Sequence, residues 1–404
     1  MTTQAAFFSP YDYAFHEDPY PVYESLRANA PVFHNSELGL WALSRHADIA
    51  EAFRDDSTFS AALGVSPDPA AYGKHAYKTM SFLAMDDPRH NQLRRLVNKG
   101  FTPRRVTGLS EQITALTERY WGECLDRARA GEVVDFIADF AGKLPMDVIS
   151  ELMGVPEEDR TRLRALADEV MHRDEDVFDV PETAMTASLE LIVYYQGLVA
   201  ERRAEPKDDL TSALIAAEVD GDKLSDDEII SFLFLMVIAG NETTTKLLGN
   251  ALYWADRNPD VKAKVFADPD RVEDWVNETL RFDTSSQMVL RTTSSEVEVA
   301  GERIPEGEKV LLLIGSANRD AEVFDRPAEY DIDRGSWDGL MSFGVGTHFC
   351  LGAHMARLEA HISLRAILST LEDFSLDGGE VRVHSSNVRG FSSLPMRLVP
   401  KMEA

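Results

Sequence analysis

The hydrophobic and polar positions along this chain follow mainly the period of an α-helix. In most long segments the apolar residues recur three and four positions apart, which is the spacing that places them on one helix face. These segments are also rich in residues with high helix propensity. Helices are therefore predicted over residues 19–28, 46–55, 88–100, 107–130, 145–153, 157–172, 183–205, 225–258 and 270–282.

Segments with a strand pattern are fewer and shorter. Apolar and β-branched residues bounded by Gly, Pro or Asn predict strands within residues 32–44, 296–300, 309–314 and 380–399. The sequence contains no internal repeat, low-complexity tract or Gly/Ser-rich linker. We therefore expect residues 1–404 to form one domain that is mainly α-helical, with small β-sheets.

The central helix has the clearest start signal. Ser225 and Glu228 have the S-x-x-E spacing of a capping box, and residues 229–239 are almost entirely apolar. If the helix extends to Asn258, it is ~50 Å long at ~1.5 Å rise per residue and must cross the core. A buried polar group costs roughly 1–3 kcal/mol unless it is hydrogen-bonded. The polar residues 241–244 in the middle of this helix therefore indicate a functional site.

Composition and charge exclude several classes of protein. The 404 residues include 69 acidic and 41 basic side chains, and the formal charge of -28 argues against a nucleic-acid or anionic-membrane binder. Residues 1–10 lack the pattern of a signal peptide, and the apolar run 229–239 is too short to span a bilayer. Cys124 and Cys350 lie far apart in sequence, so a disulfide framework is not expected. We expect a soluble, cytoplasmic protein with no membrane span and no nucleic-acid partner.

The segment 343–352 is the most specific in the chain. It reads FGVGTHFCLG and places Cys350 after two glycines, which permit a tight turn with backbone amides facing inward. Such amides stabilise a thiolate, and a soft anionic sulfur suits iron. A buried structural cysteine is the alternative when the residue is considered alone.

The pattern F-G-x-G-x-H-x-C-x-G resembles the haem-binding loop of the cytochrome P-450 family, and the resemblance extends over nearly the whole chain. It implies the fold of that family, with a long central helix over haem b. It also implies that Cys350 is the iron ligand. Further haem contacts implied by the resemblance are Phe343, Gly344, Gly352 and Ala239.

The sequence AGNETT at residues 239–244 resembles the oxygen-activation motif of the family. The resemblance implies that Ala239 leaves space above the iron and that Glu242 and Thr243 are catalytic, relaying protons to bound dioxygen. A hydroxyl at Thr243 can also bond back to the Ala239 carbonyl and open the helix locally. In the structural alternative, Glu242 and Thr243 merely satisfy each other or neighbouring loops.

Two further motifs occur in the order of the family. Glu278 and Arg281 match E-x-x-R and share a helix face, and the resemblance implies a buried structural pair joined by Arg334. The second motif supplies basic side chains for the haem propionates, because buried carboxylates need charge-assisted hydrogen bonds. Each of these residues alone is more often a solvated surface charge. The implied propionate contacts are His90, Arg94, Arg291 and His348.

The resemblance implies a haem-thiolate monooxygenase that inserts one atom of dioxygen into a small hydrophobic substrate. No segment resembles a flavin or iron–sulfur domain, so electrons are expected from a ferredoxin and its NAD(P)H-linked reductase. The basic residues Arg95, Lys99, Arg104 and Arg105 suit docking of an acidic ferredoxin, although a solvated helix face explains them equally well.

The resemblance also implies a pocket that is mostly apolar. Where many bacterial relatives have Pro-Val, this chain has Ser285-Ser286, so Ser286 can bond either a substrate oxygen or the backbone. Terpenoids, steroids, fatty acids, aromatic acids and secondary metabolites all stay open as substrates. The expected pocket residues are Phe82, Val177, Phe178, Leu235, Ile238, Ser286, Met288, Val289 and Phe391.

Two other readings compete with the monooxygenase. A peroxide-driven peroxygenase or haem isomerase typically lacks the acid and threonine pair that this chain keeps as Glu242-Thr243. A non-enzymatic haem sensor or electron carrier predicts no cavity large enough for a substrate.

Overall fold

The computed structural model describes residues 8–100, 103–172, 179–219 and 221–402. All nine predicted helices are confirmed, each within four residues of its expected ends. Helices of eight or more residues are α2 (Tyr20–Asn29), α3 (His46–Arg54), α5 (Arg89–Gly100), α6 (Pro103–Arg129), α7 (Leu144–Met153), α8 (Glu157–Met171), α9 (Glu182–Ala204), α11 (Asp226–Arg257), α12 (Pro259–Ala267), α13 (Val272–Phe282) and α15 (Ala353–Thr370). Shorter helices are α1 (Tyr13–Glu17), α4 (Tyr77–Met80), α10 (Leu210–Ala216) and α14 (Ile314–Ala317).

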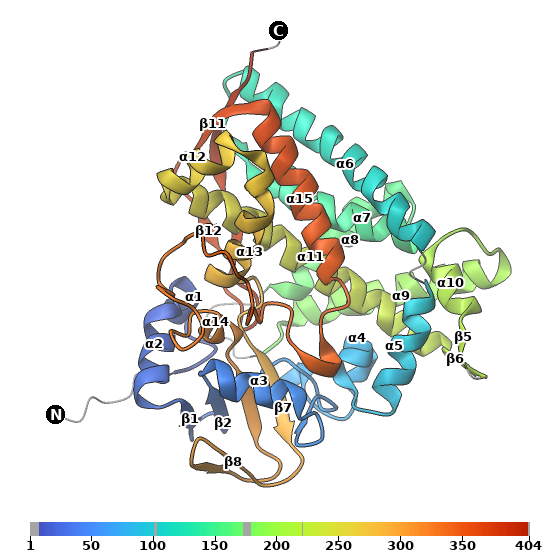
Figure 1. The fold of residues 1–404 in the computed structure, drawn as a ribbon. Helices are drawn as coiled ribbons and strands as arrows, with labels where there is room; N and C mark the ends of the chain where they lie inside the picture. The colour runs from blue at the N-terminus through green and yellow to red at the C-terminus, as the bar shows by residue number, and fades with distance from the viewer. Residues whose placement is uncertain (1–7, 101–102, 173–178, 220, 403–404) are drawn as a thin grey trace.

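Helix α11 crosses the interior and contacts α4, α7, α9, α13 and α15 (Figure 1). Its N-terminus has the predicted capping box: the Ser225 hydroxyl accepts from the Glu228 backbone, and the Glu228 carboxylate accepts from the Ser225 backbone. Both bonds satisfy backbone donors that the first helical turn leaves unpaired. Apolar residues on all sides of α11 are buried, as expected for a helix that neighbours surround.

The β-strands form small sheets, as predicted. In the largest sheet the strand order is β1-β2-β10-β7-β3, and only the β2/β10 pair is parallel. Its strands are β1 (Val32–Asn35), β2 (Leu40–Leu43), β10 (Lys309–Leu312), β7 (Val289–Thr293) and β3 (Phe59–Ser60). A second sheet contains β11 (Leu371–Leu376), β14 (Pro395–Pro400) and β4 (Val134–Asp135). Two-stranded pairs are β12 (Val381–Arg382) with β13 (Phe391–Ser393), β5 (Glu218–Val219) with β6 (Asp222–Lys223), and β8 (Val297–Val299) with β9 (Glu302–Ile304).

The buried apolar side chains form two clusters. The larger cluster lies among the helices and includes Leu248 and Trp275. The smaller cluster joins α2 and α3 to the largest sheet and includes Tyr23 and Leu311. In Figure 1 this sheet lies at the lower end of the molecule, away from most helices. None of the helices within the described residues is long and apolar enough to cross a membrane.

Candidate active site

A cavity of about 270 Å³, partly open to solvent, lies between the two apolar clusters. This volume is near the lower end of the ~300–1,000 Å³ range of small-molecule pockets. Residues of α11 and of the loop around Cys350 both face it. Its principal lining residues are Phe53, Phe82, Phe232, Leu235, Met236, Ala239, Gly240, Thr243, Leu247, Ser286, Val289, Arg291, Ile314, Phe343, Gly344, His348, Cys350 and Gly352.

Two glycines shape the loop that carries Cys350. Gly344 and Gly346 have φ values of +66° and +74°, in the left-handed region where a Cβ is unfavourable. A Cβ on Gly346 would also lie 2.8 Å from the Phe53 carbonyl oxygen. The Cys350 backbone N–H donates to the Phe343 carbonyl at 2.9 Å, which closes the loop. The exposed part of the Cys350 side chain faces the cavity.

The surroundings of the Cys350 sulfur favour a thiolate only in part. Burial within the protein raises the pKa of the thiol, whereas backbone N–H groups of Gly352 and Ala353 and the charge of Arg94 act to lower it. These N–H groups belong to the start of α15, whose dipole also favours an anion. Arg94 is held beside the loop by hydrogen bonds to the carbonyls of Thr347 (3.1 Å) and Phe349 (2.6 Å). A cation that binds the sulfur would complete the stabilisation of the thiolate.

The structure brings together the four basic residues expected at the propionates. Arg291 is fully buried, and burial lowers the pKa of its guanidinium to about 10. The rings of His348 and His90 are tilted by 45° with centroids 4.2 Å apart, and Arg291, His90 and Arg94 all act on the charge of His348. Burial, with these neighbours, lowers the pKa of His348 to about 2. The buried charge of Arg291, beside Arg94 and the two imidazole rings, makes the cluster suited to an anion.

Unpaired polar atoms in this cluster test whether a haem fits. Both ring nitrogens of His90 and of His348 are buried without a hydrogen-bond partner among the described residues. Among the described residues, the Arg291 side chain makes one hydrogen bond, to the neighbouring Leu290 carbonyl at 2.8 Å. Buried donors of this kind cost stability unless a ligand satisfies them. Two carboxylates on a macrocycle whose iron faces Cys350 would supply the missing acceptors, so the residues fit haem.

Helix α11 presents small and polar residues to the same cavity. Ala239 and Thr243 line it, and the Thr243 hydroxyl donates to the Ala239 carbonyl at 2.9 Å, the back-bond considered from the sequence. Glu242 does not line the cavity. Its carboxylate is buried and lies 2.9 Å from the Lys246 ammonium, one turn further along α11. The sequence analysis did not single out Lys246.

Four of the expected pocket residues line the cavity, namely Phe82, Leu235, Ser286 and Val289. Met288 directly precedes β7 and does not line the cavity, because it is buried in the smaller apolar cluster.

Ile238 and Phe391 do not line the cavity either. Leu235, Ala239 and Thr243 repeat every four residues on one face of α11, and Ile238 falls beside that face, against the larger cluster. Phe391 packs against Tyr253 with ring centroids 4.7 Å apart. Val177 and Phe178, also expected at the pocket, lie outside the described residues.

Sequence reasoning missed several residues of the cavity wall. Phe53 comes from α3 and Ile314 from the start of α14, so neither lies near a recognised motif. Phe232 and Met236 belong to the same face of α11 as Leu235 and Thr243. Helical spacing from Ala239 could have identified these two residues.

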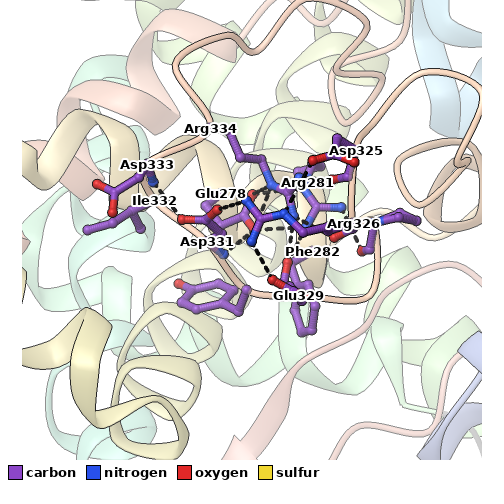
Figure 2. A network of polar contacts seen from close by, with 12 residues as sticks. Glu278, Arg281, Phe282, Asp325, Arg326, Glu329, Asp331, Ile332, Asp333 and Arg334 are labelled. Carbon is purple, nitrogen blue, oxygen red and sulfur yellow. Dashed lines mark hydrogen bonds and ion pairs between the residues drawn. The ribbon is translucent and has the colours of Figure 1, made fainter.

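A buried ionic network lies on α13 (Figure 2), the helix whose Leu280 lines the cavity. The Arg281 guanidinium donates two hydrogen bonds to the Glu278 carboxylate, at 2.7 and 2.8 Å, and both side chains are fully buried. Arg334 lies where the sequence analysis expected it, with its Nε 3.2 Å from Glu278. Arg281 also donates to the carbonyls of Asn318 and Glu329. The network therefore fixes the loop before the Cys350 segment to α13.

Comparison with known proteins identifies the family. The family model for cytochrome P450 matches residues 39–395. A protein of Mycobacterium tuberculosis that carries the name cytochrome P450 123 is 57% identical over 388 residues, covering 96% of each chain.

Solved structures agree with the sequence comparison. The structure of cytochrome P450 CYP109Q5 from Chondromyces apiculatus has a TM-score of 0.88 and 33% identity, covering 99% of this chain and 100% of that one. CYP109E1 from Bacillus megaterium, crystallised in complex with testosterone, has a TM-score of 0.82 and 30% identity, covering 94% and 99%. This chain therefore belongs to the cytochrome P450 family, whose members are monooxygenases that bind haem iron through a cysteine thiolate.

Proposed function

We propose that this protein, acting as a single domain, hydroxylates a small hydrophobic substrate with dioxygen and two electrons from a ferredoxin. The observation that carries the proposal is one cavity lined by Cys350, by Thr243 and by apolar side chains. A sensor or electron carrier needs no such cavity, whereas a cavity lined mainly by apolar side chains can hold a hydrophobic substrate. We also propose a cytoplasmic location, as expected from the cysteine content.

We assign roles to the residues from their positions. Haem, when bound, supplies activation of dioxygen and transfer of one oxygen atom. Cys350 holds the iron as a thiolate, and Arg291 and His348 bind the haem carboxylates together with His90 and Arg94. Thr243 holds a hydroxyl at the cavity wall, where its bond to the Ala239 carbonyl fixes the oxygen as an acceptor for a proton relayed to the cavity. Phe343, Gly344 and Gly352 shape the cysteine side of the cavity.

The substrate wall is mainly apolar, with a polar position at Ser286. Phe82, Leu235 and Val289 supply apolar surface, which suits a hydrocarbon skeleton. Ser286 pairs with Val388 through a backbone bridge, and its side chain lines the cavity. A hydroxyl at this position can bond an oxygen on the substrate. Because the similar CYP109E1 was crystallised with testosterone, we propose steroids as the first class to test.

The redox partner is proposed from charge. Arg95 and Lys99 are exposed on α5, in the neighbourhood of the loop that Arg94 contacts. An acidic ferredoxin would be attracted to this face of an otherwise acidic protein. Arg104 and Arg105, which complete the expected basic cluster, have side chains outside the described part of the chain. Reduction by the ferredoxin should slow as ionic strength rises, because salt screens the attraction.

The proposal is tested by optical titration of the ferric, haem-loaded protein with steroids, terpenoids, fatty acids and aromatic acids. A saturable shift of the Soret band reports displacement of water from the iron, and ferredoxin-driven turnover then identifies the product. Cys350→Ser should abolish the thiolate signature of the carbon monoxide complex, whereas Cys124→Ala, at a buried site outside the cavity, should keep it. Absence of product with ferredoxin, but product with peroxide, would favour a peroxygenase instead.

A further inference from the structure

A second cavity, separate from the one at Cys350, opens between the N-terminal helices and the C-terminal part of α11. It has a volume of about 500 Å³ and is partly open to solvent. None of the described residues that line it also lines the cavity at Cys350. Four arginines from distant parts of the chain line it, namely Arg27, Arg319, Arg382 and Arg389. Such a convergence of guanidinium groups is unexpected in a chain with 41 basic and 69 acidic residues.

One buried carboxylate balances part of this positive charge. Asp283, at the end of α13, accepts hydrogen bonds from the Arg389 Nε and from the Tyr20 hydroxyl, both at 2.6 Å. Its other oxygen accepts from the Trp254 indole N–H at 2.8 Å. Burial acts to raise the pKa of Asp283, but the charges of Arg389 and Arg382 lower it below its ordinary value. This carboxylate therefore already accepts three hydrogen bonds, and it cannot neutralise all the arginines around it.

Arg319 presents a fixed donor to this cavity that has no acceptor. Its guanidinium lies between the rings of Tyr20 and Phe282, at 3.4 and 3.5 Å from the ring centroids. Its Nε donates to the Phe282 carbonyl at 2.8 Å, which sets the direction of the group. Arg319 is only 9% exposed, and its Nη2 has no hydrogen-bond partner among the described residues. Because a buried donor without an acceptor costs stability, this N–H group indicates a ligand.

Arg382 supplies a second unpaired donor. Its guanidinium lies over the rings of Phe391 and Tyr253, at 4.4 and 5.3 Å from the ring centroids. The Asp283 Oδ2 lies 3.7 Å from the Arg382 Nη1, which is beyond hydrogen-bonding distance. This Nη1 is buried and has no hydrogen-bond partner among the described residues. The inner wall of the cavity therefore carries unpaired N–H groups from two different guanidinium groups.

The acidic residues that line the cavity are exposed to solvent. They are Glu17, Asp18 and Glu24. The Glu17 carboxylate lies 3.3 Å from the His384 Nε2, and the Asp18 carboxylate accepts from the Tyr20 backbone N–H at 3.2 Å. Salt and water screen exposed charges, whereas buried charges are screened much less. The buried guanidinium groups therefore dominate the inner wall, and they attract an anion.

We propose that this second cavity binds a phosphate group, either the free ion or a small organic monoester, between Arg319 and Arg382. Phosphate presents oxygens in several directions and can accept from two separate guanidinium groups, whereas a carboxylate matches the fork of a single arginine. Tyr253 and Trp254 add aromatic surface to the cavity, which suits the organic part of a monoester. The site lies outside the cavity at Cys350, so the inference does not depend on the proposed monooxygenase.

Isothermal titration calorimetry with inorganic phosphate and with phenyl phosphate tests the proposal. The protein is loaded with haem, so that the basic cluster at Arg291 is occupied, and sodium chloride holds the ionic strength constant. We expect saturable binding of one equivalent. Tighter binding of inorganic phosphate would identify the free ion as the ligand, and tighter binding of phenyl phosphate would identify a monoester. If neither probe binds saturably, the proposal is overturned.

Substitutions then locate the bound phosphate. Arg382→Gln should weaken binding by about tenfold or more, because a charge-assisted hydrogen bond is lost. Arg319→Lys keeps the charge but removes the Nη2 donor, and it should weaken binding as well. Arg303→Gln is the control, because it removes the same charge from a side chain of β9 that is 70% exposed. An unaltered Soret band shows that each variant keeps its fold. If Arg382→Gln and Arg319→Lys bind phosphate as tightly as Arg303→Gln does, the site is refuted.

Discussion

At the scale of single residues, Thr243 and Glu359 are polar side chains whose expected effects differ because they lie in different places. Thr243 lines the cavity and donates to the Ala239 carbonyl. Glu359 is fully buried on α15, and its Oε2 has no hydrogen-bond partner among the described residues. Burial alone raises the pKa of Glu359 to about 8. The first residue is therefore expected to affect turnover and the second to affect stability.

Replacing Thr243 by Ala should reduce the product formed per NAD(P)H consumed. Loss of this positioned hydroxyl is expected to lower product formation by about tenfold to a hundredfold. General acid–base catalysis typically contributes ~10²–10⁴-fold, so this loss lies at the lower end of that range or below it. The consumption of NAD(P)H and the formation of product are measured together. Thr245→Val is the control, because the Thr245 hydroxyl donates to the Ala141 carbonyl, outside the cavity. Equal effects of the two changes would contradict a role for Thr243 in proton delivery.

Replacing Glu359 by Gln should change how stability depends on pH. Between its ordinary pKa of 4.5 and about 8, the unfolded chain releases this proton while the folded protein retains it. The free energy of unfolding of the native protein should therefore fall as pH rises, by roughly 1.4 kcal/mol per pH unit from this group. Glu359→Gln should remove that slope in urea unfolding experiments. Glu372→Gln, on the exposed side of β11, should leave it unchanged.

At the scale of elements, the ionic network of Figure 2 joins α13 to the segment that contains Arg334. Glu278→Gln would leave Arg281 buried without its anion, which costs about 3–5 kcal/mol. Urea unfolding should show this loss in the free energy of unfolding. The matched control is Glu190→Gln, which breaks an exposed pair with Arg162, worth about 0–1 kcal/mol. If Glu278→Gln and Glu190→Gln lowered the free energy of unfolding by similar amounts, burial would not make the Glu278–Arg281 pair more costly to break.

At the scale of the whole molecule, the formal charge of -28 opposes compaction. Salt should therefore raise the Tm, because the screening length falls from ~30 Å at 0.01 M to ~8 Å at 0.15 M ionic strength. A gain of about 1 kcal/mol corresponds to a few degrees at most for a chain of this size. Calorimetry across a sodium chloride series measures the shift. Near the pKa of the carboxylates the same series should give little or no rise, since protonation removes the charge.

The sequence by itself determined which segments are helical and where the cysteine loop lies. These features are local: helix periodicity repeats within a few residues, and Gly344 and Gly346 permit the φ values that turn the chain before Cys350. The capping box at Ser225 could be predicted for the same reason, because its two residues lie only three positions apart. Helices α12 and α15 were not predicted, and neither were the short helices α1, α4, α10 and α14.

Only the tertiary structure decided which side chains reach the cavity and which partners they have. Met288 is apolar and adjoins the cavity residue Val289, yet it packs into the smaller apolar cluster, and Phe391 packs against Tyr253. Glu242 belongs to a recognised motif, but the burial of its carboxylate depends on the helices that pack around α11. The physical reason is the same in each case. A local pattern specifies the conformation of a segment, whereas the packing of distant segments specifies direction, burial and charge.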